Sequence, residues 1–177
     1  TPFREKHPEV TFSVVFRTSL QVLSLLENFE IDVGITYLEN EPLGRVVSVP
    51  FYSERYQLIT AAGSPLADRE QVTWKEVAEL PLCLLTSDMQ NRRIINQHLE
   101  EAGGHVKPTL ESDSMMLLFS HIRTGKWASI MPLNFKDVLG LTEPIRSIPI
   151  AEPDATHPVG VVALERAPHP PLVAALL

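Results

Sequence analysis

Short apolar runs alternate with stretches of helical spacing along most of the 177-residue chain. β-branched and aromatic residues predict strands at residues 10–16, 31–36, 45–51 and 55–62. The spacing from Leu20 to Phe29 predicts a helix whose apolar face contains Val22, Leu23, Leu25, Leu26 and Phe29. Asn28 is expected to end it, because asparagine tolerates the left-handed conformation. Strand, helix and strand follow so closely that they predict a βαβ unit with parallel strands.

The same alternation continues to the end of the chain. A short helix is expected at residues 74–80, followed by strands at 81–85, 109–112, 127–132, 145–150 and 158–165. Helices are expected from residues 86–88 to Ala102, from residues 113–114 to Gly125, and in the closing PPLVAALL segment. Strands that alternate with helices across short connections predict an α/β fold.

Three predicted strands end at hydroxyl-bearing or acidic helix starts, at residues 17–19, 86–88 and 112–114. In open α/β sheets, ligands bind outside the carboxyl ends of the strands. Helix N-termini carry free N–H groups and partial positive charge, which suits anions. The pattern therefore indicates a site for a small polar or anionic ligand. The alternative is that these residues only cap helices, which is the commoner role of Ser, Thr and Asp there.

Composition and charge exclude several classes of protein. Apolar residues make up 44% of the chain and charged residues 21%, which indicates a folded chain. A net charge of −7 argues against DNA binding by this chain itself. The single cysteine, Cys83, excludes an internal disulfide and fits a reducing, cytoplasmic compartment. No apolar run approaches the roughly 18 residues of a membrane span, and the first residues read as the end of a helix rather than a signal peptide.

The sequence gives little support for redox chemistry, metal binding or catalysis. Arg92 and Arg93 follow the strand end at 86–88 and fit either an anion-binding role or a solvated helix surface. Cys83 is expected to behave as a small buried hydrophobe rather than a redox sensor. The histidines at 105, 121, 157 and 169 do not fall at metal-ligand spacing. No Gly-rich phosphate loop and no paired nucleophile and base are apparent, so neither a cofactor nor an enzymatic activity is predicted.

The motifs "FREKHPEVTFSV", "IDVGIT", "PFYSERYQLITAAGSPLA", "VTWKEVAELPLCLL" and "HIRTGKWASIMP" occur in this order. Together they resemble the effector-binding domain of LysR-type transcriptional regulators over essentially the whole chain. One departure is Asn28-Phe29-Glu30, which stands where the family usually has glycine. The resemblance implies a periplasmic-binding-protein-like fold of type 2, with two Rossmann-like lobes joined by two crossover strands. Lobe I would comprise residues 1–55 and 165–177 without its first strand, and lobe II residues 56–164.

The resemblance also implies a function. A small effector, expected to be a carboxylate or an oxyanion, would bind between the lobes. The residues expected to hold it are Thr18, Ser19, Thr36, Thr86, Ser87 and Ser112. The domain would form homodimers, and tetramers in the full-length protein, and would reach DNA only through an N-terminal helix-turn-helix that these 177 residues lack. Two alternatives remain: a solute-binding protein of a transporter, and an enzyme on a similar two-lobed scaffold.

Overall fold

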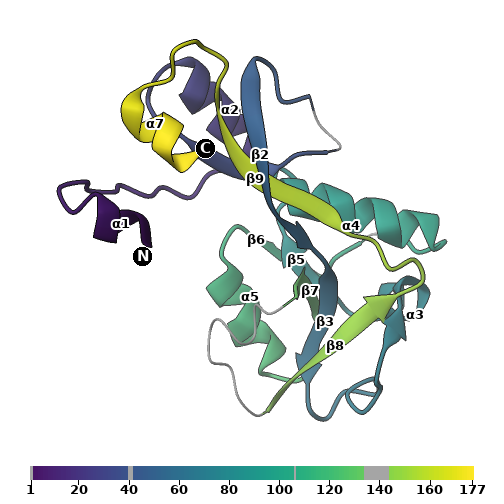
Figure 1. The fold of residues 1–177 in the computed structure, drawn as a ribbon. Helices are drawn as coiled ribbons and strands as arrows, with labels where there is room; N and C mark the ends of the chain where they lie inside the picture. Colours follow the sequence, from purple (N-terminus) through teal and green to yellow (C-terminus); the bar gives the residue numbers. More distant parts are fainter. Residues whose placement is uncertain (1, 40–41, 106, 134–143) are drawn as a thin grey trace. The chain divides into compact units, whose positions relative to one another are not determined.

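The computed structural model describes residues 2–39, 42–105, 107–133 and 144–177. The chain folds into two compact units (Figure 1). Unit 1 comprises Thr1–Tyr52 and Pro158–Leu177, and unit 2 comprises Ser53–His157. Each unit combines helices with a β-sheet, so the predicted α/β class is confirmed.

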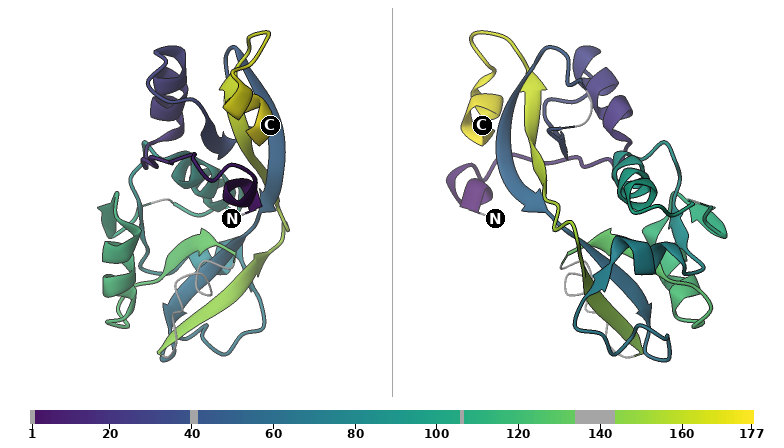
Figure 2. Two further views of the ribbon diagram at one scale, coloured as in Figure 1. Left: turned by 60° about the vertical axis from the view of Figure 1, so that its left-hand side comes forward. Right: turned by 90° about the vertical axis from the view of Figure 1, so that its right-hand side faces the viewer.

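Unit 1 is built on a three-stranded sheet with the order β1-β9-β2. Its elements are α1 (Pro2–Lys6), α2 (Ser19–Glu27), β1 (Gly34–Tyr37), β2 (Val46–Glu54), β9 (His157–Leu164) and α7 (Pro171–Leu176). The helices α2 and α7 lie on opposite sides of the β2–β9 ribbon (Figure 2). Val22 and Leu26 of α2 pack against Val162 of β9 and form the centre of the apolar core.

Residues 10–16 do not form the predicted strand. They are extended but pair with no strand, and β1 instead pairs antiparallel with β9. Phe12, Val14 and Phe16 are 51%, 90% and 70% exposed. A β-branched and aromatic composition favours a strand only where a hydrogen-bonded neighbour is available. The predicted parallel βαβ unit around α2 is therefore wrong.

Helix α2 ends at Asn28, as predicted, but the left-handed residue is the one that follows it. Asn28 is the C-cap with φ −84°, and Phe29 is the left-handed residue, with φ +59°. Phe29 N–H donates to Leu26 O at 3.0 Å and Glu30 N–H donates to Leu25 O at 2.9 Å. These two bonds form a Schellman motif, in which glycine is the usual left-handed residue. A phenylalanine in that position is unusual, and its side chain is 71% exposed.

Unit 2 has a four-stranded sheet, β4-β8-β3-β7, and a parallel pair, β5-β6. Its elements are β3 (Tyr56–Ala61), β4 (Val72–Thr73), α3 (Trp74–Ala78), β5 (Cys83–Leu85), α4 (Gln90–Glu101), β6 (Leu110–Ser112), α5 (Met115–Ile122), β7 (Ser129–Pro132) and β8 (Ile145–Ala151). A parallel bridge between Leu82 and Ala128 connects the two sheets. Leu118, Phe119 and Ile122 of α5 are buried.

Two strands contain the boundaries between the units. The division falls at 52/53 within β2 and at 157/158 within β9. The lobe arrangement implied by the family resemblance has its crossings near Glu54–Tyr56 and Leu164–Pro168. The second boundary lies earlier in the chain because residues 159–162 of β9 pair with β1 of unit 1.

The close approach of α2 to β1 depends on Gly34. A Cβ atom at this position would collide with Cγ1 of Val22 and lie 3.2 Å from Cγ2 of Val162. Val22 is buried and β-branched, so its side chain cannot turn away. Gly34→Ala is expected to lower the free energy of unfolding of unit 1 by about 1–3 kcal/mol. The control is Gly63→Ala, since a Cβ there meets nothing within 4 Å. Thermal melts measured side by side check this, and equal losses in the two variants would contradict it.

Candidate functional site

Three of the predicted site residues come together in unit 1. Thr18 is the N-cap of α2, and its hydroxyl accepts from Gln21 N–H at 3.3 Å while Thr18 N–H donates to Gln21 Oε1 at 3.1 Å. Thr36 of β1 donates to Ser19 Oγ at 2.8 Å. The end of β1 and the start of α2 are thereby joined. The first turn of α2 contains no acidic residue, so its partial positive charge is not neutralised locally.

The other three predicted residues lie at adjacent strand ends in unit 2. Strands β5 and β6 are parallel and in register, with Leu85 opposite Ser112, so Thr86 follows β5 beside the end of β6. Ser112 is buried, and its hydroxyl accepts from Ser114 N–H at 3.0 Å. The Thr86 hydroxyl oxygen is buried and has no hydrogen-bond partner among the described residues. Leaving such a group unpaired costs free energy, so this hydroxyl is a candidate for contact with a ligand.

The expected capping role of residues 86–88 is wrong. Helix α4 begins at Gln90, and its N-cap, Met89, makes no side-chain cap bond. Residues 86–89 instead form a turn closed by Met89 N–H on Thr86 O at 3.1 Å. Arg93 Nη1 donates to the carbonyls of Ser87 and Asp88 at 3.3 and 2.6 Å. The turn lengthens the connection, so the hydroxyls of Thr86 and Ser87 are not used to cap α4. At β6 the prediction is confirmed, because Ser114 caps α5.

Arg92 proves to be a buried structural residue, which the sequence did not predict. Its side chain is 4% exposed. Nη1 donates to Leu85 O and, at 2.6 Å, to Glu111 Oε1, while Nε donates to Asn96 Oδ1 at 2.7 Å. The guanidinium therefore joins α4 to the ends of β5 and β6, next to Thr86 and Ser112. An arginine followed by asparagine four residues later is a possible sequence signal, but it does not reveal the strand contacts.

Cys83 behaves as predicted for a small buried residue. It is fully buried in β5, and burial raises the pKa of its thiol to about 11. Because the thiolate is the reactive form of cysteine, this environment suppresses redox chemistry.

A contact in unit 2 between the buried His98 and the partly buried His157 was also missed from the sequence. His98 of α4 and His157 approach with their Nε2 atoms 3.0 Å apart. The His98 ring stacks on Trp74 at 4.6 Å, and its Nδ1 lies 3.9 Å from Glu101. The two histidines are separated by 59 positions, so local spacing gives no signal. One ring must donate and the other accept, so at least one must be neutral.

The lowered pKa of His98 predicts that the free energy of unfolding decreases in acid. Burial, and then the charge of His157, lower the pKa of His98 against a smaller opposing effect of Glu101. Below about pH 6.5 the unfolded chain takes up a proton that the folded chain binds more weakly, so folding stability falls as the pH falls. His98→Phe is expected to flatten this dependence while retaining the stack on Trp74. Urea unfolding at several pH values measures the slope, and parallel profiles for parent and variant would contradict the prediction.

The described residues provide hydrogen-bond donors rather than catalytic groups. The hydroxyls of Thr18, Ser19, Thr36 and Ser112 contact other hydroxyls, Gln21 or backbone N–H groups. Within the four described ranges no cluster of three or more His, Cys, Asp or Glu side chains is arranged to hold a metal. No helix in these ranges has both the length and the apolar composition needed to span a bilayer.

Two α/β units with hydroxyl groups at their strand ends define a ligand-binding type of domain. Residues 1–177 match the family model of the LysR substrate binding domain. The chain therefore belongs to this family, whose members are transcription regulators and not enzymes. This assignment also decides against the transporter alternative raised by the sequence.

Comparisons with individual proteins agree with this family assignment. Over 123 residues the chain is 29% identical to the HTH-type transcriptional regulator SsuR of Burkholderia cenocepacia, covering 70% of this chain and 40% of that protein. It is 28% identical over 125 residues to the regulator cbl of Escherichia coli, covering 70% and 39%. The chain thus spans about 40% of the length of these relatives.

Solved structures confirm the fold. The effector-binding domain of QuiR in complex with shikimate matches with a TM-score of 0.84 and 19% identity, over 98% of this chain and 82% of that one. The reduced OxyR regulatory domain of Pseudomonas aeruginosa matches with a TM-score of 0.83 and 19% identity, over 98% and 84%. The predicted periplasmic-binding-protein-like α/β fold is therefore confirmed.

Proposed function

We propose that this effector-binding domain senses a small carboxylate or oxyanion. Thr18 and Ser19 would donate hydrogen bonds from unit 1, with Ser19 held in place by the bond from Thr36. Thr86, Ser87 and Ser112 would donate from unit 2. Neutral donors suffice, because hydrogen bonds to a charged acceptor are stronger than neutral ones. The observation that carries the proposal is the buried hydroxyl of Thr86, which lacks a partner next to Ser112 at the end of β6.

The arrangement in unit 1 supports the same class of ligand. The bond from Thr36 to Ser19 holds the strand end against the first turn of α2. The leading N–H groups of that turn have no carbonyl four residues earlier in the helix. An anion placed there receives N–H donors together with the positive end of the helix dipole. The shikimate complex of QuiR, a domain of the same fold, involves a ligand that is a small carboxylate.

The proposed mechanism is a shift in the arrangement of the two units, which would be the lobes of the sensor. A ligand shifts such an equilibrium only by its difference in affinity for the two states. We propose that the shift alters packing in a homodimer, and in a tetramer of a longer protein. DNA-binding segments outside these 177 residues would then change their spacing. We also propose that the protein acts in the cytoplasm.

A thermal-shift screen tests the ligand class. The panel is sulfate, thiosulfate, nitrate and shikimate, with chloride at matched ionic strength as the control. At about 100 times its dissociation constant a ligand adds roughly 2.7 kcal/mol to the free energy of unfolding. At least one panel compound is expected to raise the melting temperature saturably. A panel in which every compound behaves like chloride would contradict the proposed ligand class.

A further inference from the structure

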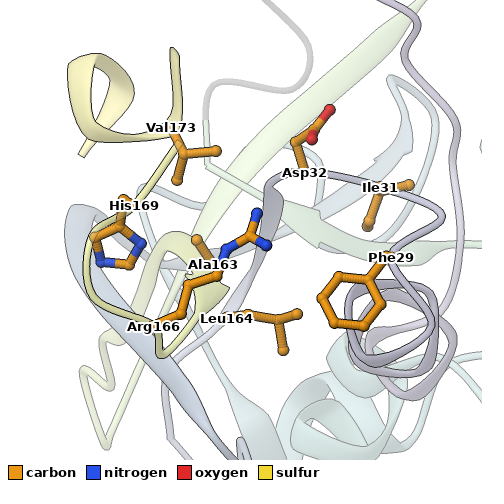
Figure 3. Close-up of a pocket in the computed structure, with 8 residues that line it drawn as sticks. All are labelled: Phe29, Ile31, Asp32, Ala163, Leu164, Arg166, His169 and Val173. Atoms are coloured by element: carbon orange, nitrogen blue, oxygen red, sulfur yellow. The ribbon is translucent and has the colours of Figure 1, made fainter. Parts of the chain in front are cut away.

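Unit 1 contains a second concave site, which we call the Arg166 pocket. It is a cavity of about 190 Å³ whose lining includes Phe29, Asp32, Leu164, Arg166, His169 and Val173 (Figure 3). These residues come from the segment after α2, the end of β9, the segment after β9, and α7. The volume is below the roughly 300–1,000 Å³ of pockets for drug-sized molecules, so it suits a small ligand.

The cation in this pocket is available to an anion. Arg166 is exposed, and its guanidinium lies in the middle of the ring of lining side chains (Figure 3). Its Cζ is 5.8 Å from the centre of the Phe29 ring. Within the described part of the chain, no carboxylate forms an ion pair with Arg166. A guanidinium held by an aromatic face retains its N–H donors for a carboxylate.

His169 adds an unsatisfied polar group. Its Nδ1 is buried and has no hydrogen-bond partner in the part of the chain that the structure describes, and Figure 3 shows a ring nitrogen turned toward Arg166. A buried ring nitrogen without a partner costs free energy that a bound polar atom would recover. Leu164 and the buried Val173 provide apolar surface beside these polar groups.

The backbone of Phe29 provides an independent observation. Phe29 adopts φ +59° at the Schellman position of α2, where a bulky side chain is disfavoured and glycine is free of strain. Its ring is 71% exposed and therefore gains little from core packing. The fold does not require phenylalanine at this position, whereas a ring that stacks on a ligand and on Arg166 would account for it.

From these contacts we propose that the Arg166 pocket binds a small monocarboxylate with an apolar or aromatic body. The carboxylate pairs with Arg166 and receives a hydrogen bond from His169, while the apolar body lies against Phe29 and Val173. Asp32 repels a second negative charge and so disfavours dicarboxylates. The site is separate from the proposed effector site. It lies beyond the C-terminal end of α2, whereas Thr18 and Ser19 are at the other end of this nine-residue helix, which is roughly 13 Å long.

NMR titration of the isotope-labelled 177-residue chain with sodium benzoate tests this proposal, with benzamide as the neutral analogue. Benzoate is expected to shift amide signals of residues 29–32 and 163–173 saturably, with a Kd of about 1 mM or lower. Benzamide is expected to bind at least about tenfold more weakly, because it lacks the charge. An absence of saturable shifts, or shifts confined to other residues, would overturn the proposal.

Four variants sharpen the test. Arg166→Gln is expected to weaken benzoate binding about tenfold, whereas Arg123→Gln, the same change at an exposed position of unit 2, leaves it unchanged. Asp32→Asn is expected to tighten binding by removing a like charge. Phe29→Gly is expected to weaken binding about fivefold without lowering the melting temperature, because glycine relieves the left-handed strain. Equal affinity in Arg166→Gln and Arg123→Gln would refute the site.

Discussion

Trp74→Ala is expected to destabilise unit 2 by about 3–5 kcal/mol, a large part of the 5–15 kcal/mol that stabilises a typical domain. Trp74 is 2% exposed and lies at the start of α3. Its ring stacks on His98 at 4.6 Å and meets Tyr56 edge-on at 6.1 Å, and its Nε1 donates to Pro153 O at 3.4 Å. Truncation removes these interactions and leaves a large cavity.

Fluorescence during urea unfolding measures this loss. The chain has only two tryptophans, and Trp127, also in unit 2, remains as the reporter in the variant. Phe16→Ala is the matched aromatic truncation, because Phe16 is 70% exposed, and it is expected to change stability by less than about 0.5 kcal/mol. Trp74→Phe retains much of the ring volume and is expected to cost less than Trp74→Ala. Similar losses for Trp74→Ala and Phe16→Ala would contradict the proposed core of unit 2.

The second large effect is expected for Arg92→Met, at about 2–3 kcal/mol. The substitution leaves Leu85 O and Asn96 Oδ1 without their donor. Glu111 contributes less, because its side chain is 46% exposed and its charge remains hydrated after Arg92 is removed. The loss of hydrogen bonds to the strand end therefore outweighs the loss of the ion pair. Arg123→Met, at an exposed position, is the control.

A double-mutant cycle separates the two contributions. Combined with Glu111→Gln, Arg92→Met is expected to show a coupling energy below about 1 kcal/mol, the range of exposed ion pairs. The amide signals of Thr86 and Ser112 are expected to shift in Arg92→Met, because the guanidinium holds both strand ends. A coupling energy as large as the whole effect of Arg92→Met would show that the ion pair dominates.

Much of the fold could be predicted from the sequence because local signals and tertiary structure agree there. Strands β3 and β5 follow continuous apolar runs that unit 2 buries. Helices α3 and α4 follow apolar residues at helical spacing, such as Ile94, Ile95 and Leu99 of α4. The prediction of a strand at residues 10–16 was wrong because a strand requires a hydrogen-bonded neighbour, and composition does not reveal whether one is present. The left-handed conformation expected of Asn28 was wrong, because it occurs at Phe29, where glycine or asparagine is usual.

The sequence predicted some residues of the candidate site but not the contacts that hold them in place. Hydroxyls at strand ends gave Thr36 and Ser112, and the N-cap rules gave Thr18. The turn at 86–89 and the buried hydrogen bonds of Arg92 depend on residues far apart in the chain. His98 and His157 likewise meet only through tertiary packing. No periodicity or spacing rule encodes such interactions, so reasoning from the sequence alone missed them.

The most direct test of the central claim is calorimetric titration of Thr86→Val with the panel compound that most raises the parent's melting temperature. Valine keeps the shape of threonine and removes a buried hydroxyl that has no partner in the four described ranges. We predict that the ligand-free variant is as stable as the parent or more stable, while its affinity falls about tenfold. Thr124→Val, at an exposed position, should leave the affinity unchanged. Unchanged affinity in Thr86→Val would contradict the proposed placement of the ligand.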